Sequence, residues 1–422
     1  MDKPRLRDVS LQHAVLEGSP VIILKDPEHF SEKTLCIPEN KAILFILSCM
    51  DGEHSLVDIQ ADFMRRFGTL VMSDQIRSIV NTLNENHFLD NEDFLLFRNS
   101  VMESFRTSQV ISSCMAGVTY PADPEEITKL LDSILDQAGT PGIRKENRSG
   151  KKPKALIAPH IDFARGGRVY AAIYNMLASD DMPDLFLIFG TAHHPSTTLF
   201  IPTRKSFETP LGVAQTDIQI LDLLETFLPS EQLYKDEFCH RGEHSIEFQA
   251  LWLQHIYSGR TIPILPILCS SFEKFTNSQT SPDRDEEFSV FINALTGALQ
   301  KSGKRVMVIA GADLSHVGSS FGDPFVRGLP DVFLEQVRRL DQSLVEAVCS
   351  GDAPLFFDRI ATSHDRYRVC GLPPIYSLLT ILPRITRTGE QAKIRGNLID
   401  YDQSLDQERT TSVSFAGMVF YE

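Results

Sequence analysis

Short runs of consecutive apolar residues, separated by stretches with helical periodicity, dominate the longer C-terminal part of the chain. A strand that is apolar at every position is buried on both faces, which requires helices on both sides of its sheet. Helical periodicity over residues 127–137 and 218–228 supplies such helices. The pattern predicts an α/β domain with a central, mostly buried mixed sheet flanked by helices. Its strands are expected at residues 155–158, 185–190, 306–310 and 415–420.

One apolar run, residues 262–268, contains Pro263 and Pro266. Proline has no N–H to donate to a neighbouring strand, so within sheets it occurs mainly at edges and irregularities. This run is therefore predicted to form an edge strand or an irregular strand.

The first 97 residues follow a different pattern. Ser55 is placed to cap a helix and Gly68 to end it, and residues 88–94 resemble a short hairpin. Three small helices closed by a hairpin predict a winged-helix-like α+β domain over residues 1–97. A polar linker at 98–113 would join it to the larger domain at 114–422. Within the small domain we expect a strand at 21–24 and helices at 41–50 and 56–67. A third helix is expected to be capped by Ser73 or Asp74, with Ile76, Ile79, Val80 and Leu83 on one face.

The candidate recognition helix of the small domain carries Asp74 and Glu85 as well as Arg77, and so has little net positive charge. Contact with DNA phosphates needs clustered Lys and Arg, so docking of a peptide or protein is favoured instead. The layout also resembles the PqqD-type domain, which implies a three-helix bundle that holds a partner peptide.

The overall charge narrows the class of partner. With 41 basic and 56 acidic residues, the formal net charge is -15, which argues against nucleic acid or an anionic membrane surface. The sequence shows no apolar stretch long enough to span a bilayer and no signal peptide, so a soluble, cytoplasmic protein is expected. The seven cysteines are scattered without a CxxC pair, which predicts reduced thiols rather than disulfides or a zinc knuckle.

Histidines follow the predicted strands at the points where the strands end. His160 follows the first run, His193 and His194 follow the second, and Asp313 with His316 follows another. The carboxyl ends of strands in an open α/β sheet are where ligands bind. One such histidine alone is more often a core residue. Several that converge predict a metal site, acid/base chemistry, or both.

The segment 240–247 adds two histidines and two carboxylates. If it is helical, Glu243 and Glu247 share a face, and His244 and Glu247 could reach a common pocket. The spacing is not that of the HExxH zinc motif. At the second strand end, neighbouring side chains point to opposite sides, so only one of His193 and His194 is expected at the centre.

Cys370 is the cysteine with the most distinctive context. Gly371, Pro373 and Pro374 predict a stiff turn that exposes the preceding thiol. Beside a histidine cluster, a thiolate is a soft metal ligand or a redox-sensitive group. The alternative is an inert buried thiol.

Six dispersed motifs occur in order along the chain: Ala116-Gly117 with Tyr120-Pro121, Ala158-Pro159-His160, Gly190-Thr191-Ala192-His193-His194, Glu243-His244-Ser245-Ile246-Glu247, Asp313-Leu314-Ser315-His316 and Cys370-Gly371-Leu372-Pro373-Pro374-Ile375. Taken together, they resemble the Memo family over about residues 111–422. The chain resembles more closely the bacterial and archaeal branch of that family, AmmeMemoRadiSam system protein B. It departs from the family's common pattern at Met115 and at Ile161-Asp162-Phe163.

The resemblance implies a fold similar to the LigB-type extradiol dioxygenases, which use non-haem iron(II). It implies that His160 and His193 bind metal together with Cys370. It implies further that His244 is an acid/base histidine, and that Asp313 with His316 lines the same pocket. Asp162 is either an additional ligand or the partner of Arg165.

Two functions remain open at this point. The first is a non-haem metal-dependent oxidoreductase, dioxygenase-like, with Fe(II) favoured and Cu or Zn as alternatives. The family resemblance implies a role beside a radical SAM enzyme and an AMMECR1-type protein, although this chain has no CxxxCxxC motif. The second is a non-catalytic scaffold that retains the pocket and binds a peptide or protein.

Overall fold

The computed structural model of the chain describes residues 2–16, 19–31, 33–137, 152–177, 181–324, 326, 328–386 and 394–421. The chain divides into two compact units, residues 1–108 and 109–422. Among the described residues, no helix is both long enough and apolar enough to cross a bilayer.

The first unit is an α+β domain. A three-stranded antiparallel sheet in the order β1-β2-β3 precedes the helices, and a buried apolar cluster that includes Ile59, Ile76 and Phe88 forms the core. The predicted strand at 21–24 is confirmed as part of β2. The elements are β1 Ser10–Leu16, β2 Ser19–Lys25, β3 Leu35–Pro38, α1 Lys41–Ser48, α2 Leu56–Phe67, α3 Ser73–Glu85 and α4 Glu92–Thr107.

The second predicted helix is confirmed to the residue as α2. The Ser55 hydroxyl oxygen accepts a hydrogen bond from the Asp58 N–H, and the Asp58 carboxylate accepts one from the Ser55 N–H, which completes a capping box. Gly68 ends the helix in the left-handed conformation, with φ 69°.

The predicted hairpin over 88–94 is wrong. Leu89 forms only an isolated bridge with Leu6, and a helix begins at Glu92. Asn91 explains the difference, because its side chain accepts a 2.9 Å hydrogen bond from the Phe94 N–H and caps helix α4. The region expected as a linker is occupied by the second half of α4 and then by strand β4, Val110–Ser112.

The second unit is built on a sheet that is 11-stranded in the part of the chain that the structure describes. The order is β12-β14-β5-β11-β6-β10-β9-β8-β4, with β13 on β14 and β7 on β10. Its centre, β5-β11-β6-β10, is parallel, and β14 joins β5 antiparallel. This confirms the predicted mixed α/β fold. The strands are β5 Pro153–Ala158, β6 Leu185–Thr191, β7 Phe200–Pro202, β8 Ser206–Thr209, β9 Gly212–Thr216, β10 Pro263–Cys269, β11 Val306–Gly311, β12 His316–Gly318, β13 Arg395–Leu405 and β14 Thr411–Tyr421.

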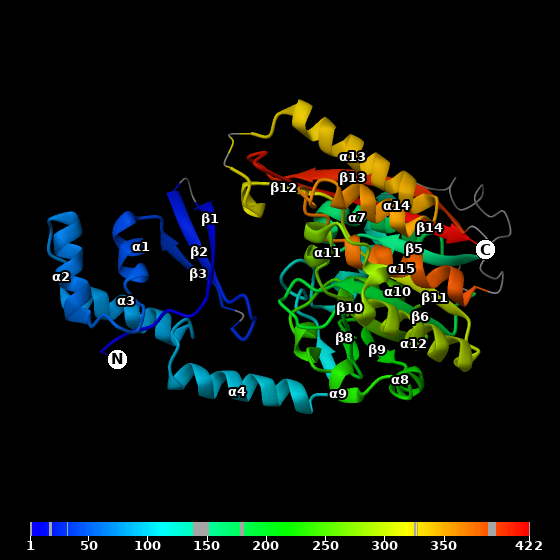
Figure 1. Cartoon of the computed structure of the whole chain (residues 1–422), viewed down its shortest axis with the longest axis horizontal. Helices are drawn as coiled ribbons and strands as arrows, with labels where there is room; N and C mark the ends of the chain where they lie inside the picture. Colours follow the sequence, from blue (N-terminus) through cyan, green and yellow to red (C-terminus); the bar gives the residue numbers. More distant parts are fainter. Residues whose placement is uncertain are drawn as a thin grey trace. The chain divides into compact units, whose positions relative to one another are not determined.

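Helices cover both faces of this sheet (Figure 1). Helix α15 packs against β5, β11, β6 and β10 on one face, with α12 and α14 beyond it. Helices α7 and α10 lie on the opposite face, with α5 against both. The helices are α5 Pro124–Gln137, α7 Phe163–Tyr174, α8 Ile218–Glu225, α9 Ser230–Leu233, α10 Glu247–Ile256, α11 Glu273–Ser278, α12 Glu286–Ser302, α13 Asp331–Cys349, α14 Ala353–Ala361 and α15 Leu372–Ile385.

The proline-containing strand β10 is not an edge strand, so the first of the two predicted alternatives is wrong, but its pairing on one side is interrupted as in an irregular strand. It pairs along its length with β6, and its other side is shared between β9 at Pro263–Ile264 and β7 at Ile267–Cys269. Pro266 falls in the gap between these two pairings, so no partner strand on that side requires its N–H.

The three central strands end in register. Ala158 of β5 pairs with Gly311 of β11, and Gly311 pairs with Gly190 of β6. Residues a few positions beyond each of these three therefore emerge side by side at one edge of the sheet. This alignment places His160, His193 and Asp313 at a common edge.

Two glycines let the segment before helix α10 approach this edge. A Cβ built at Gly190 would lie 2.6 Å from Ser245 Oγ, and a Cβ at Gly311 would overlap the Ser245 carbonyl oxygen. Any larger residue would push the segment 243–246 away from the strand ends. Close packing therefore explains why Gly190, near the end of β6, is a glycine.

Replacing Gly311 with alanine tests this close approach. The added Cβ meets a backbone atom that cannot rotate away, so the free energy of unfolding should fall by about 1–3 kcal/mol in urea titrations. Gly297→Ala in α12 is the matched control, because its Cβ meets only the half-exposed Phe227 ring at 3.1 Å. A loss for Gly311→Ala no larger than that for Gly297→Ala would contradict the packing described.

Candidate metal centre

Three of the predicted residues lie together at the carboxyl edge of the sheet. One ring nitrogen each of His160 and His193 and the Cys370 Sγ lie within 4.8 Å of one another. His160 Nε2 is 3.3 Å from Cys370 Sγ. His160 and His193 follow β5 and β6, whereas Cys370 precedes helix α15 on one face of the sheet.

His160 is fixed by hydrogen bonds on both its backbone and its ring. Its N–H donates to Asp313 Oδ1 at 3.0 Å, and its Nδ1 lies 3.0 Å from the Gly311 carbonyl oxygen. A carbonyl only accepts, so Nδ1 carries the proton and Nε2 keeps its lone pair. Burial lowers the pKa of His160 to about 4, and the neighbouring His193 acts in the same direction. The ring is therefore neutral at pH 7.

Asp313 is a buried carboxylate behind His160. Besides the backbone bond, its Oδ2 lies 3.7 Å from His160 Nε2. Burial raises the pKa of Asp313, while His316 and the His160 N–H oppose that effect. The hydrogen bond from the His160 N–H to Asp313 thus links the segment that follows β5 to the segment that follows β11.

His193 is held by Glu243, one of the two carboxylates of the segment 240–247. Glu243 Oε2 accepts the His193 N–H at 2.9 Å and is 3.0 Å from its Nδ1. Burial disfavours charge on the His193 ring, but the Glu243 charge outweighs it and raises the pKa of His193. The sequence signal for Glu243 was its place among the histidines of this segment, and contact with His193 was not predicted.

Glu243 is saturated with hydrogen bonds. It also accepts the N–H groups of His244 at 2.8 Å and Ser245 at 2.9 Å. Burial would raise the pKa of this carboxyl, yet His193 and these donors hold it well below its usual range. The segment before α10 is thereby tied to the end of β6.

His244 is stacked on His193 and faces the cluster. The two ring centroids are 5.2 Å apart with an interplanar angle of 6°, and the His160 ring lies 5.6 Å from His244. Burial lowers the pKa of His244 to about 4, although Glu243, 3.5 Å from its Nδ1, opposes the shift.

His316 approaches Cys370 from the other side. Its Nδ1 lies 3.0 Å from the Leu314 carbonyl oxygen, and its Nε2 is 3.9 Å from Cys370 Sγ. Burial lowers the pKa of His316 to about 4. All the predicted catalytic and metal residues are therefore near one another, with Cys370 between His160 and His316.

Cys370 lies in a turn, as predicted, but it is half-buried rather than exposed. Pro373 and Pro374 are the second and third residues of α15, where the first-turn N–H groups have no helical partner, so the prolines start the helix. Cys370 keeps partial exposure. Burial, helped by the Asp313 charge, raises the pKa of its thiol well above the usual range.

The helical-face interpretation of the segment 240–247 is wrong. Helix α10 begins only at Glu247, so Glu243 and Glu247 do not share a face. The Glu247 carboxylate points elsewhere and accepts from the Tyr120 hydroxyl at 2.5 Å and from the Cys114 N–H at 2.8 Å. Glu247 anchors the start of the second unit rather than lining the cluster.

Asp162 pairs with Arg165, one of the two roles open from the sequence. It caps helix α7 by accepting the Arg165 N–H, and its Oδ2 lies 2.6 Å from Arg165 Nε. His193 rather than His194 contributes the ring at the centre, as the alternation of side chains predicted.

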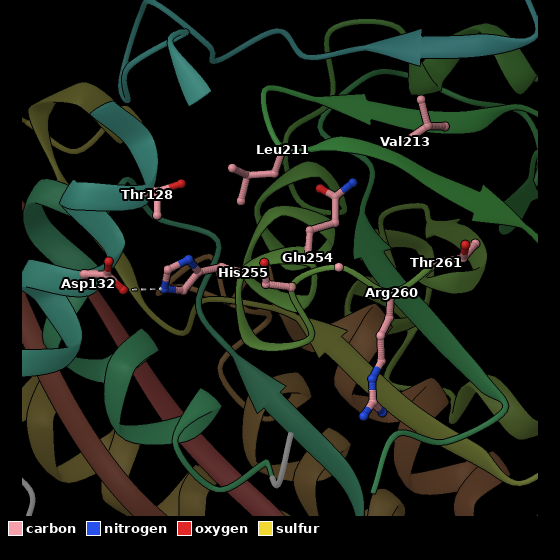
Figure 2. A pocket seen from close by; sticks show the side chains of 10 residues that line it. Thr128, Asp132, Leu211, Val213, Gln254, His255, Arg260 and Thr261 are labelled. Atoms are coloured by element: carbon pink, nitrogen blue, oxygen red, sulfur yellow. Dashed lines mark ion pairs between the residues drawn. The ribbon is translucent and has the colours of Figure 1, made fainter. Parts of the chain in front are cut away.

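A cavity of about 350 Å³ opens beside the cluster, and His193 and Cys370 form part of its wall. A larger pocket, of about 610 Å³, lies between α5 and the end of α10 and contains none of these residues (Figure 2). There His255 is paired with Asp132 at 3.2 Å, and Arg260 points away from Gln254. The candidate metal ligands His193 and Cys370 thus line the smaller cavity and not the larger one.

Fold and site together define an α/β protein with a histidine and cysteine cluster at the carboxyl edge of the parallel centre of a mixed sheet. Residues 112–419 match the family model described as Memo-like protein, so the chain belongs to the Memo family. This confirms the family expected from the motifs.

Similar curated proteins carry the same family description. A MEMO1 family protein of Aquifex aeolicus (strain VF5) is 26% identical over 419 residues, covering 99% of this chain and 100% of that protein. One from Thermus thermophilus is 26% identical, covering 79% and 91%. One from Pyrococcus furiosus is 25% identical, covering 72% of this chain and 97% of its own length. The similarity to the Aquifex protein therefore includes the first unit.

The buried histidines predict acid sensitivity of the metal-free protein. An unfolded histidine takes up a proton near pH 6.5, whereas folded His160, His244 and His316 do so only near 4. Stability should fall as the pH drops through this window, by roughly 1 kcal/mol per histidine at about pH 5.5. His193, with its raised pKa, offsets part of the loss. His316→Gln should flatten the dependence in urea unfolding at several pH values, and an unchanged slope would contradict the neutral burial of His316.

Proposed function

We propose that the second unit is a non-haem metal-dependent oxidoreductase in which His160, His193 and Cys370 hold the metal ion. Iron(II) is the proposed metal, with copper and zinc as competitors. The observation that carries the proposal is the approach of two imidazole nitrogens and one thiol to within 4.8 Å of one another. Ligands of a tetrahedral ion with bonds of about 2.0–2.3 Å lie roughly 3.3–3.8 Å apart, so little adjustment is needed.

The donor chemistry supports a transition-metal ion. His160 donates from Nδ1 to a carbonyl, so its Nε2 keeps a lone pair for a metal. His193 donates from Nδ1 to Glu243, so its Nε2 can bind a metal once the proton that Glu243 favours on this ring is lost. Burial keeps His160 neutral, which is the ligand form. Because burial opposes loss of the Cys370 proton, metal uptake should release a proton from that thiol.

A second set, His193, Glu243 and His244, also lies within 4.8 Å. An ionised carboxylate has about four lone-pair sites, and Glu243 already accepts from three backbone N–H groups and the His193 ring. Glu243 has no free lone pair to offer, so the set with Cys370 is favoured. Glu243 then orients His193 as a ligand.

A redox-active ion bound at this site would supply electron exchange with a substrate or with dioxygen. His244 is not part of the favoured donor set and is neutral at pH 7, so we assign it the role of general base. The Glu243 carboxylate, 3.5 Å from His244 Nδ1, would stabilise the imidazolium after proton uptake. Asp313 and His316 complete the wall, and Asp313 positions the His160 backbone.

The proposal also covers the proteins with which this chain acts. The order of the six motifs supports placement in the AmmeMemoRadiSam system protein B branch, with a role as accessory to a radical SAM enzyme and an AMMECR1-type protein. The first unit, an α+β domain without a basic helix, is proposed as a PqqD-like docking module for a peptide or protein partner.

Metal analysis of protein purified without oxygen tests the site directly. Wild-type protein should bind about one iron per chain, and His160→Ala or Cys370→Ser should lower the affinity by at least about 100-fold, since each removes a ligand. Cys36→Ser, an exposed cysteine of the first unit, is the matched control and should bind iron like wild type.

Absence of iron, copper and zinc uptake by folded wild-type protein would overturn the enzyme proposal. The non-catalytic scaffold would then be the better description. Equal loss of metal in Cys36→Ser and Cys370→Ser would also contradict it, because the thiol would then have no specific role.

Glu243→Gln tests the orienting role of the buried carboxylate. The variant keeps the size of the side chain but loses the charge that holds His193, so iron affinity should fall about 10- to 100-fold in competition titrations. Glu247→Gln, which changes a buried carboxylate bonded away from the cluster, is the control. Equal effects of the two substitutions would show a general loss of folding rather than a role in the site.

A further inference from the structure

The cavity beside the centre has walls of two kinds. Its deeper wall is apolar and consists of Phe272, Val369 and Leu372, each only 2% exposed, together with Pro373. His193 and Cys370 open onto the same space. A ligand seated there would place an apolar body against this wall and lie next to the candidate metal ligands.

The outer wall carries two carboxylates, Glu273 of α11 and Asp365 of the segment before Cys370. No Lys or Arg of the described residues lies within ion-pair distance of Glu273. Lys274, its neighbour in sequence, is bonded to Asp285 at 3.0 Å. The charge of Glu273 at the cavity is thus left without an ion-pair partner among the described residues.

The one guanidinium that lines the cavity is already used. Arg368 pairs with Asp323 at 2.7 Å and donates to the His316 carbonyl oxygen at 3.3 Å. Burial raises the pKa of Asp365 to about 6, while the hydrogen bond from the Val369 N–H and the Arg368 charge act against burial. The Glu273 charge also raises this pKa, so the two carboxylates are close enough to repel each other.

The backbone that presents Asp365 is unusual. His364, Asp365 and Arg368 all have left-handed φ values, 49°, 50° and 50°, within a single short segment. Such conformations are costly for these residues and are retained chiefly where surrounding structure enforces them, often at ligand sites. The His364 ring, whose Nδ1 lies 3.2 Å from the Thr276 carbonyl oxygen, ties this segment to α11. The two carboxylate-bearing walls are therefore held together.

We propose that this cavity is the substrate site and that it takes a small organic cation, an amine with an apolar body, whose ammonium group lies between Glu273 and Asp365. The apolar body would pack on Phe272 and Leu372, and its far end would face His193 and Cys370. The ligand class deepens the proposed function and rests on it for the assignment of the centre. The cavity volume of about 350 Å³ suits a ligand with a single ring and a short chain.

Three probes of similar shape test the charge preference: benzylamine, benzyl alcohol and benzoate. Binding to the full chain is measured by calorimetry and ligand-observed NMR near pH 7.5, where the Asp365 carboxyl is ionised. Benzylamine should bind about tenfold more tightly than benzyl alcohol, and benzoate more weakly than either, because each of the two partly exposed carboxylates contributes a factor of about three.

Variants then locate the site. Asp365→Asn and Glu273→Gln together should reduce benzylamine affinity to that of benzyl alcohol. Asparagine tolerates the left-handed backbone and can still accept from the Val369 N–H, so the fold should persist. Glu231→Gln, an exposed acid of helix α9 outside the cavity, is the matched control and should leave binding unchanged.

The outcomes separate this proposal from the metal site. Iron content is measured on every sample, and the probes are tested with and without iron. Normal iron binding with equal affinity for the three probes, or with benzylamine affinity unaffected by the double variant, would overturn the amine site alone. No binding of any probe would also overturn it. Loss of iron binding with the benzylamine preference intact would overturn the metal proposal alone.

Discussion

The structure of the site depends on the register of three parallel strands. Ala158, Gly311 and Gly190 lie in one row, so the residues that follow β5, β11 and β6 emerge side by side. Nothing larger than glycine fits at Gly190 or Gly311 while Ser245 remains in place. Helices α10 and α15 lie on opposite faces of the sheet. The segments that precede them meet at this edge and contribute His244 and Cys370.

The buried Glu243 carboxylate holds the residues at this edge in fixed positions relative to one another. It binds the backbone of three residues and the ring of His193, which fixes that ring's orientation and raises its pKa. His160 and His316 are held by carbonyl oxygens instead, so burial dominates and lowers their pKa values. One cluster thus contains both a cation-favouring histidine and neutral ones, an arrangement compatible with metal binding and with proton transfer.

Much of the fold could be predicted from the sequence where hydrophobicity is local. The central strands β5, β6 and β11 are apolar throughout because they are buried on both faces, and His160 and His193 follow from the strand ends. The ring that Glu243 holds, His193, lies 50 residues away in the sequence, so no local pattern could reveal this contact. The hairpin expected at 88–94 failed because Asn91 caps a helix, and β10 is not at an edge because Pro266 falls where one side of the strand has no partner.

X-ray absorption at the iron edge of the loaded protein tests the metal centre most directly. A single sulfur ligand at about 2.3 Å with nitrogen ligands at about 2.0–2.1 Å is the predicted result, and the sulfur signal should vanish in Cys370→Ser while remaining in Cys36→Ser. Iron bound without any sulfur ligand, or a sulfur signal that survives Cys370→Ser, would contradict the assignment of His160, His193 and Cys370 as the ligands.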